Sequence, residues 1–560
     1  SWRINGKIDP DAALASGKTA QDFFYYLTSI GTVDLVTDLN FEDSTSDTSI
    51  KSKKMKKYSL ILTSLLIIAG MGCKKDFLEQ SNPNAVTVEN AYNTETDITT
   101  GVYGVYQALR SGNCVGEGAN LWTDNRSDDV NTTDQQSNNG EPFQFSAFSL
   151  VPSNSYLLSH WNALYVPISR ANIILSIIDK IKFESPATKT QYIAEMKFIR
   201  AFMYYNLVKE FGDVPLVTER LTSAEQAAAL TFREKKEKVY DQIVADLKDV
   251  ATSNLPVVHT AANKGRVSLQ AANALLGKVY LTMATSLSAN KTENLNKAKD
   301  ALLVCFSQKT FANLADIPFA DVFDVAKKAT NAEIIFQIVY KQGDVSLSSS
   351  LARSNQARGE TINSLFVAQG TGGLFTNDLL KEFETGDLRT TYSIKLAPSS
   401  GRYFITKFRD ASAGASTLGY GGNDWILLRY ADVILCLSET YLLLNDQANA
   451  IKYLDMVRDR AKRPLYAVMM NDPMYKARYP TLKLAIMHER RVELAFEHHR
   501  WHDLTRFFNE AELVAYFRAK IQLDYDNCPL SNFTAKDFYF PIPLKEFLLN
   551  PTKMYQNPGY

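Results

Sequence analysis

The strongest constraint on the fold is a set of apolar residues that recur every three or four positions over most of the chain. In residues 189–211 this set consists of Tyr192, Met196, Ile199, Met203, Leu207 and Phe211. This spacing places the side chains on one face of an α-helix, because a helix has about 3.6 residues per turn. Gly212 and Pro215 follow, and both are typical of a helix C-terminus. The pattern predicts a mostly α-helical protein.

Further helices are predicted in pairs. Residues 267–284 and 295–306 form one pair, and residues 425–444 and 447–461 form another around a turn at Asn445. Small residues that would allow close crossings in these segments are Ala271, Ala274, Ala298 and Ala448. Helix pairs of this size resemble tetratricopeptide repeats, which form a scaffold rather than an active site. By itself this feature suggests a module that binds a partner protein.

Three long polar segments interrupt the helices. We name them loop A (residues 112–159), loop B (residues 342–373) and loop C (residues 398–423), and all are rich in Gly, Ser, Asn and Thr. Most connections in compact domains have about 4–6 residues, and much longer ones are commonly functional or disordered. We therefore predict a mostly α, tetratricopeptide-like helix-pair scaffold whose long irregular loops form the ligand-binding side, and we interpret loop A as functional.

The composition excludes several classes of protein. The chain has 560 residues, of which 45% are hydrophobic, so it can bury a large core. Its 61 basic and 61 acidic residues give a formal net charge of +0, which argues against a nucleic-acid partner, because such proteins carry a concentrated basic face.

The five cysteines form no CxxC pair, and their odd number leaves at least one thiol for another use. They are Cys73, Cys114, Cys305, Cys436 and Cys528.

Residues 55–73 read MKKYSLILTSLLIIAGMGC, with two lysines, an apolar run over residues 60–69 and small residues before Cys73. This is the layout of a secretory signal. The apolar run is shorter than the ~20 residues that a membrane-spanning helix needs. Residues 70–73 resemble a lipoprotein cleavage site, after which Cys73 would be the acylated N-terminus, although Gly70 stands where the pattern prefers leucine. The alternative is an ordinary signal followed by a chance cysteine.

The domain organisation follows from this signal, which must stand near the N-terminus to be recognised. Residues 1–54 are therefore predicted not to belong to the mature protein, because the start codon was assigned too early. A real extra segment, which would bury the signal and change the localisation, is the alternative. The predicted parts that follow are a signal peptide (55–72), a polar tether (73–94) and one domain (95–560) with an N-terminal part at about 95–330 and a C-terminal part at about 331–560.

Several blocks, taken in order, resemble the SusD/RagB family of nutrient-binding outer-membrane lipoproteins. They are CKKDFLE (73–79), HWNALYVPISRAN (160–172), EMKFIRAFMYYNLVKEFGDVPLVTE (195–219), GRVSLQAANALLGKVYL (265–281), WILLRYADVILCLSETYL (425–442), HERRVELAFEHHRWHDLTRF (488–507) and FPIPLKEFLLNPTKMYQNPGY (540–560). Together they extend over nearly the whole chain from Cys73 onward. Their order and completeness carry the resemblance, not any single block.

The resemblance implies one compact unit in which four tetratricopeptide-like helix pairs form one side. It also implies a Bacteroidetes-type protein that is held in the outer membrane by a lipid anchor, faces the exterior and delivers oligosaccharides to a SusC-like TonB-dependent receptor. Members of the family bind their ligands and do not catalyse a reaction. We therefore predict a cell-surface glycan-binding lipoprotein that is not an enzyme and has no cofactor. The alternatives are a glycoside hydrolase and a tetratricopeptide-type protein-binding adaptor.

Residues 488–507 concentrate histidines and charged residues. His498 and His502 lie four positions apart on an expected helix and could share a metal ion. The segment is not HExxH, because Val492 occupies the position of the second histidine. Glutamates at i, i+4 spacing with arginines nearby are more typical of ion pairs that tie helices together. These residues are Glu489, Glu493, Glu497, Arg490, Arg491 and Arg500. We predict no metal site and no catalytic residue.

A sugar-binding surface needs a flat aromatic face with amide, carboxylate and guanidinium groups around it. Loop A offers this mixture, and the family's ligand site also draws on this part of the chain. The candidate ligand-binding residues are Trp122, Asp124, Asn125, Arg126, Asp128, Asn154 and Tyr156. For Trp122 the alternative to an exposed ligand platform is buried packing. Asp124 and Asp128 could instead cap helices or turns.

Overall fold

The computed structural model describes residues 3–4, 7–8, 88–130, 135–357, 375–398, 400–526 and 528–560. Cys73 and the predicted signal peptide lie outside the described residues. The chain divides into two compact units, Ser1–Asn93 and Thr94–Tyr560. In the first unit, β1 (Arg3–Ile4) pairs antiparallel with β2 (Lys7–Ile8), and α4 spans Val88–Ala91. Across the described ranges, every helix is too short or too polar to span a bilayer.

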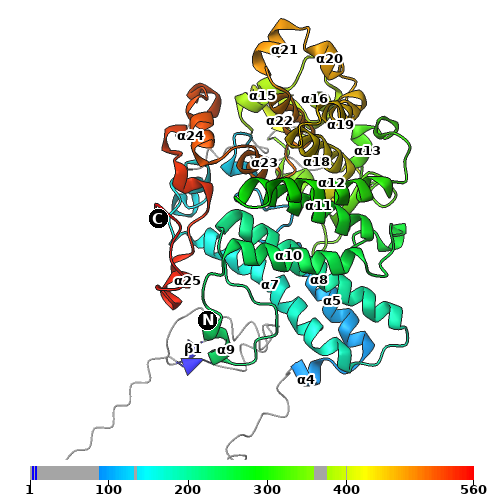
Figure 1. Ribbon diagram of the computed structural model, residues 1–560, viewed down its shortest axis with the longest axis vertical. Helices are drawn as coiled ribbons and strands as arrows, with labels where there is room; N and C mark the ends of the chain where they lie inside the picture. Colours follow the sequence, from blue (N-terminus) through cyan, green and yellow to red (C-terminus); the bar gives the residue numbers. More distant parts are fainter. Residues whose placement is uncertain are drawn as a thin grey trace, which may run out of the picture. The chain divides into compact units, whose positions relative to one another are not determined.

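Eight helices of the second unit form its scaffold. They are α5 (Glu95–Leu109), α7 (Ser155–Ile177), α8 (Pro186–Phe211), α10 (Lys236–Ala251), α11 (Leu269–Ser286), α12 (Lys291–Ser307), α18 (Tyr430–Leu443) and α19 (Gln447–Arg460). Each contacts the next in this series, so the pairs α5/α7, α8/α10, α11/α12 and α18/α19 stack in order (Figure 1). This stack confirms the predicted helical, tetratricopeptide-like scaffold.

Helix α8 shows how the local sequence sets the ends of a helix. The Ser185 side chain accepts a hydrogen bond from the Thr188 amide, and Pro186 occupies the first turn, where its missing N–H costs nothing. Gly212 ends the helix with a φ of 74°, as predicted, in a region that favours glycine. The helix is buried on nearly all sides, because α7 and α10 both pack against it.

Helices α11 and α12 approach closely at Gly277. A Cβ atom at this position would lie 2.5 Å from Cγ of Leu302, so only glycine fits there without movement. The alanines predicted at helix crossings are buried in both helices, at Ala271, Ala274 and Ala298. The prediction was wrong for Ala448, which is exposed in the first turn of α19.

The predicted helix over residues 425–444 contains a strand. Residues Trp425–Arg429 form β6, which pairs antiparallel with β3 (Ile334–Ile338), and α18 begins at Tyr430. Both strands are almost completely buried. A short run that is buried on both faces has no clear period, so the apolar pattern alone could not separate a strand from a helix.

The helix expected to carry both His498 and His502 is also interrupted. Helix α22 (Leu482–Glu493) ends before α23 (Arg500–Phe507) begins. Between them Phe496 and His498 have φ angles of 68° and 62°, which a right-handed helix excludes. His498 and His502 therefore do not lie on one helix face.

Short elements complete the unit around this scaffold. They are α6 (Phe143–Ser146), α9 (Ala224–Ala229), α13 (Phe319–Val322), α14 (Leu351–Ser354), α15 (Asn377–Glu382), α16 (Leu388–Ser393), β4 (Ile394–Ala397), β5 (Arg402–Ile405), α17 (Ala413–Leu418), α20 (Tyr466–Met469), α21 (Pro473–Arg478), α24 (Glu510–Arg518) and α25 (Leu544–Leu549). Strands β4 and β5 pair antiparallel.

Candidate functional site

The three long loops, which are far apart in the sequence, meet in the structure. The carboxylate of Glu117 in loop A accepts hydrogen bonds from the amide and the hydroxyl of Ser350 in loop B, at 2.7 and 2.8 Å. It also accepts one from the Ser349 hydroxyl. Ser349 in turn forms an antiparallel bridge with Gly421 in loop C. The scaffold therefore brings loops A, B and C into one continuous region.

The structure buries six of the seven candidate ligand-binding residues to at least 95%. These six are Trp122, Asp124, Asn125, Arg126, Asp128 and Asn154. The indole of Trp122 stacks on the His160 ring, with centroids 4.1 Å apart and an angle of 9° between the planes. Of the two alternatives for Trp122, the structure shows buried packing and not an exposed ligand platform. A direct ligand contact stays a prediction for these residues.

Asp128 is the centre of a buried ionic cluster. Its carboxylate accepts hydrogen bonds from Arg500 Nε at 2.7 Å and from the Tyr516 hydroxyl at 2.6 Å, and Lys520 Nζ lies 3.1 Å away. Burial alone would raise the pKa of Asp128, but the cations of Arg491, Arg500 and Lys520 together hold it well below its ordinary value. Asp128 thus ties loop A to the C-terminal third of the chain.

Asp124, four residues earlier, lies in a different electrostatic environment. Burial, and then the neighbouring charge of Asp129, raise the pKa of Asp124 well above its ordinary value. Its carboxylate accepts a hydrogen bond from the His498 amide at 3.3 Å, and it forms no ion pair with any residue that the structure describes. The buried Lys407 lowers the pKa of Asp124 only in part, whereas Asp128 forms direct ion pairs with Arg491, Arg500 and Lys520, so the two aspartates differ in role.

Two further candidates have clear structural roles. Asn154 caps α7, because its side-chain oxygen accepts a hydrogen bond from the Leu157 amide at 3.0 Å. The guanidinium of Arg126 lies 4.4 Å from the centroid of the Trp501 ring and 3.9 Å from that of Phe540. Such cation–π contacts stabilise a buried arginine against aromatic faces. Both residues hold loop A in place.

Tyr156 is the one candidate that remains partly exposed. Its hydroxyl accepts a hydrogen bond from Nδ2 of Asn138 at 2.7 Å. Gln135, Asn138 and Asn139 are all exposed, and the two asparagines have φ angles of 52° and 57°, which asparagine tolerates better than most residues. A partly exposed aromatic ring beside exposed amides provides both kinds of contact that a sugar ring needs. The amide-rich run QQSNNG at residues 135–140 was the sequence signal for Asn138, which the candidate set had omitted.

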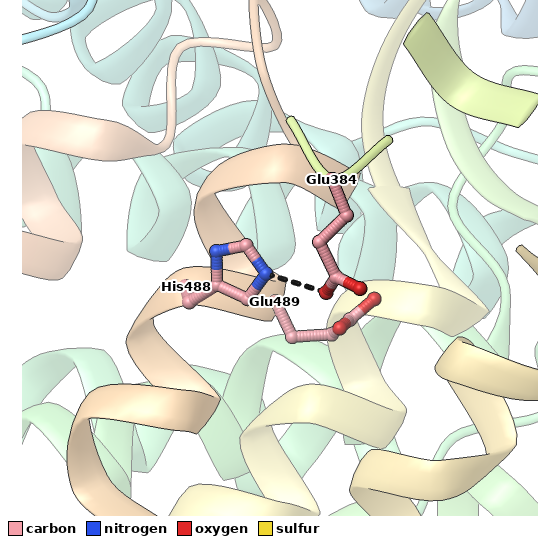
Figure 2. A group of neighbouring side chains, drawn as sticks. All are labelled: Glu384, His488 and Glu489. Carbon is pink, nitrogen blue, oxygen red and sulfur yellow. Dashed lines mark hydrogen bonds and ion pairs between the residues drawn. The ribbon is translucent and has the colours of Figure 1, made fainter. Parts of the chain in front are cut away.

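Glu384, His488 and Glu489 lie close enough together to be considered as a metal site (Figure 2). However, Nδ1 of His488 lies 2.9 Å from Glu382 and Nε2 lies 3.0 Å from Glu384. Burial would lower the pKa of His488, but its hydrogen bonds to the two carboxylates raise it above the ordinary value. With a proton on each nitrogen, the imidazolium has no free lone pair for a metal.

The third member of this group is also engaged. Glu489 accepts hydrogen bonds from Arg389 at 2.6 Å and from Arg458 at 2.7 Å, and Arg458 also binds Glu384 at 2.9 Å. The buried cations around these carboxylates neutralise them and would repel a metal ion. The group is therefore built as an ion-pair cluster.

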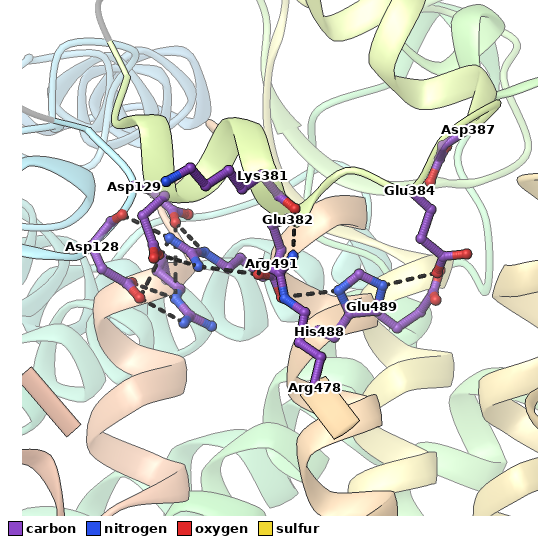
Figure 3. Close-up of polar contacts among 12 residues, drawn as sticks. Asp128, Asp129, Lys381, Glu382, Glu384, Asp387, Arg478, His488, Glu489 and Arg491 are labelled. Atoms are coloured by element: carbon purple, nitrogen blue, oxygen red, sulfur yellow. Dashed lines mark hydrogen bonds and ion pairs between the residues drawn. The ribbon is translucent and has the colours of Figure 1, made fainter. Parts of the chain in front are cut away.

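The predicted ion pairs between helices are confirmed, but with different partners. Glu493 pairs with Arg389, Arg429 and Arg460 and not with the arginines next to it on α22. Arg491 instead reaches loop A, where its Nε donates to Asp129 at 2.6 Å (Figure 3). These pairs join α22 to loop A, to the segment before α18 and to α19.

Two family models and several known proteins match this chain in sequence. A family model described as "SusD family" matches residues 381–560, and one described as "Starch-binding associating with outer membrane" matches residues 76–281. A SusD-like protein of Formosa agariphila is 27% identical over 559 residues, covering 90% of this chain and 100% of the relative. A SusD-like protein of Bacteroides ovatus is 24% identical over 406 residues, covering 65% of this chain and 68% of the relative.

Two solved structures are similar over most of the chain. A laminarin binding SusD-like protein matches with a TM-score of 0.65 at 26% identity and covers 84% of this chain and 100% of its own. Surface glycan-binding protein A from Bacteroides thetaiotaomicron, in complex with laminarihexaose, matches with a TM-score of 0.66 at 20% identity and covers 83% of this chain and 100% of its own. The second likeness shows a shared fold.

Proposed function

The chain belongs to the SusD/RagB family, and on that basis we propose that it binds oligosaccharides and delivers them to a SusC-like TonB-dependent outer-membrane receptor. The similarity to a laminarin binding SusD-like protein over 84% of the chain is the observation that carries the glycan part of this proposal. It makes laminarin oligosaccharides the first ligands to test.

We place the glycan beside the start of α7, with Tyr156 and Asn138 as contacts. The partly exposed ring of Tyr156 would pack against a sugar face, and the exposed amide of Asn138 would bind hydroxyl groups. The buried cluster around Asp128 supports this role indirectly, because it holds loop A rigidly.

We further propose that acylated Cys73 anchors the protein in the outer membrane with the loops facing the exterior, and that the mature chain starts at this residue. The predicted signal before Cys73 and the family model's description support the anchor. A receptor partner follows from the family.

The glycoside hydrolase alternative has weaker support. The buried carboxylates of loop A next to the ion cluster, Asp128 and Asp129, are held by Arg491 and Arg500. A hydrolase needs a pair of carboxyl groups on either side of a bound sugar, with one of them protonated. Carboxylates that neutralise buried arginines are not free for that role.

The test is a titration of the purified full chain with a glycan panel that includes laminarin oligosaccharides. Tyr156→Ala should weaken glycan binding by about 3–10-fold, the size expected when one aromatic contact is lost. Tyr466→Ala is the matched control, because Tyr466 is also partly exposed but lies on α20, which is not part of loops A, B or C. The Tyr466→Ala variant should bind each glycan with the same affinity as the unmodified protein.

Each outcome separates the proposals. If no glycan of the panel binds, glycan binding is refuted. If a glycan binds equally well to Tyr156→Ala, the function stands and Tyr156 leaves the site. Release of reducing sugar from the bound glycan would favour the hydrolase. A protein other than the receptor that co-purifies with the chain, while all glycans fail, would favour the adaptor.

A further inference from the structure

A cavity of about 80 Å³ lies between loop A, α8, α11, β6 and α23. Trp122 of loop A forms part of its wall, opposite residues of the scaffold. A cavity needs about 10–15 Å³ of such volume to hold one water, so this space accepts several waters or a small solute. Its lining contains both cationic and anionic side chains.

Three cations line the cavity: Lys209 of α8, Lys278 of α11 and Arg506 of α23. Lys278 forms an ion pair with Asp432, and Arg506 donates to Glu439 at 2.7 Å. Lys209 has no ion pair within the described ranges of the chain. Its ammonium group lies 4.3 Å from the centroid of the Tyr205 ring, a contact that does not neutralise the charge.

The carboxylates in the same lining are already engaged by other cations or by histidine. Nε2 of His160 lies 2.6 Å from Glu210. The Asp503 carboxylate accepts from Arg490 at 2.8 Å. The third, Glu497, accepts from Arg429 at 2.7 Å and from Lys407 at 2.6 Å. Lys209 is thus the cation of this cavity that forms no ion pair within the described ranges; burial lowers its pKa, and the adjacent Glu210 carboxylate raises it only in part.

A second group in the lining, the indole N–H of Trp122, also lacks a partner of opposite character among the described residues. The indole nitrogen of Trp122 is buried and has no hydrogen-bond partner in the part of the chain that the structure describes. An indole N–H can only donate, so it requires an acceptor. A buried donor without an acceptor costs about 1–3 kcal/mol. The lining therefore combines a lysine that forms no ion pair within the described ranges with a buried N–H group that has no acceptor there.

We propose that this cavity binds one small monovalent anion, such as a halide or formate, through Lys209 and Trp122. A single negative charge matches the single cation of this lining that forms no ion pair within the described ranges. Burial lowers the pKa of Lys209 to about 7, and a bound anion would favour its protonated form. The anion would join loop A to α8. This site does not depend on the proposed glycan-binding function.

The experiment uses bromide, which can be located by its anomalous scattering. Crystals of the full chain grown with sodium bromide should show an anomalous peak between Lys209 and Trp122. In solution, the thermal unfolding midpoint should rise with bromide concentration, because a ligand that binds only the folded state stabilises it. Lys209→Met should abolish this rise. Lys452→Met is the control, since Lys452 is exposed and likewise lies over a tyrosine ring, that of Tyr453.

A second variant keeps the test valid if Lys209→Met fails to fold. Trp122→Phe removes the N–H group but retains an aromatic ring to stack on His160, and it should weaken bromide binding by about tenfold. The proposal is overturned if the crystals show no peak in the cavity. It is also overturned if the midpoint depends on bromide equally in the unmodified protein, Lys209→Met and Trp122→Phe.

Discussion

Replacing Asp128 by asparagine tests whether loop A is held by buried charge. Asp128 has no exposed surface and accepts two hydrogen bonds from Arg500, at 2.7 and 3.0 Å, and one from Tyr516 at 2.6 Å. Asparagine has nearly the same shape but no charge. The amide N–H groups of the asparagine would also face Arg500 and Tyr516, which now donate hydrogen bonds to the second carboxylate oxygen.

The magnitude follows from what remains after the substitution. Removing one partner of a buried ion pair costs about 3–5 kcal/mol, because the other charge is left uncompensated. Arg491 would keep its bond to Asp129 at 2.6 Å, and Arg500 would keep the same carboxylate at 3.9 Å. These remaining contacts place the expected loss in unfolding free energy at the lower end, about 3 kcal/mol.

Asp124→Asn is the matched control, since it makes the same chemical change four residues away in the same buried segment. Burial raises the pKa of Asp124, and it has no ion pair among the described residues, so asparagine resembles its protonated form. The expected change is less than about 1 kcal/mol. Urea unfolding near pH 7, followed by both circular dichroism and tryptophan fluorescence, measures the difference if the two curves coincide.

The reasoning is refuted if Asp128→Asn is as stable as the unmodified protein, or if Asp124→Asn costs as much as Asp128→Asn. A glycan titration of the same variants separates structure from binding. If Asp128→Asn keeps its stability and loses glycan affinity, the original prediction of a ligand contact at Asp128 is supported instead.

Three further predictions concern packing, pH and the anchor. In urea unfolding, Gly277→Ala should destabilise the protein by about 1–2 kcal/mol, because the added Cβ would meet Leu302. Gly104→Ala is the control and should stabilise the protein by about 0.5–1 kcal/mol, because no atom lies within 4 Å of the added Cβ. Equal effects of the two substitutions would contradict the close crossing of α11 and α12. The raised pKa of His488 contributes stability that is complete below about pH 6.5 and is lost as the pH rises through the pKa of the folded state. The thermal unfolding midpoint of His488→Gln should therefore fall less with rising pH than that of the unmodified protein. The same pH profile in both proteins would contradict this. Cys73→Ser should abolish incorporation of labelled palmitate and recovery in the outer-membrane fraction, and a variant that is still labelled would exclude Cys73 as the acylated residue.

The apolar pattern was sufficient to predict most of the scaffold. Periodicity identified α8, α11, α12 and α19, and Gly212 marked the end of α8. This success has a local cause, because the hydrogen bonds, caps and amphipathic face of a helix all involve residues within a few positions of one another. The long polar segments were also visible, but the prediction that they are irregular was wrong in part, because loop A contains α6 and the start of α7, and loop C contains β5 and α17.

The sequence predicted the candidate site only in part. Loop A was identified, but its last five residues form the start of α7, where Tyr156 is partly exposed beside Asn138, which an amide-rich run could have indicated. The burial of Trp122 could not be read from the sequence, because an aromatic residue in a polar loop is compatible with both exposure and packing. What decided it was the position of His160 on another element.

Only the tertiary structure decided which charges pair. Asp128 and its partner Arg500 lie 372 positions apart, and Glu493 pairs with arginines from three other elements instead of its neighbours on α22. Helical spacing predicts partners along one helix, whereas a buried charge pairs with whichever cation the fold brings within about 3 Å of it. The sequence by itself therefore determined the helices, and the packing of those helices determined the ion pairs, the strand β6 and the cavity behind Trp122.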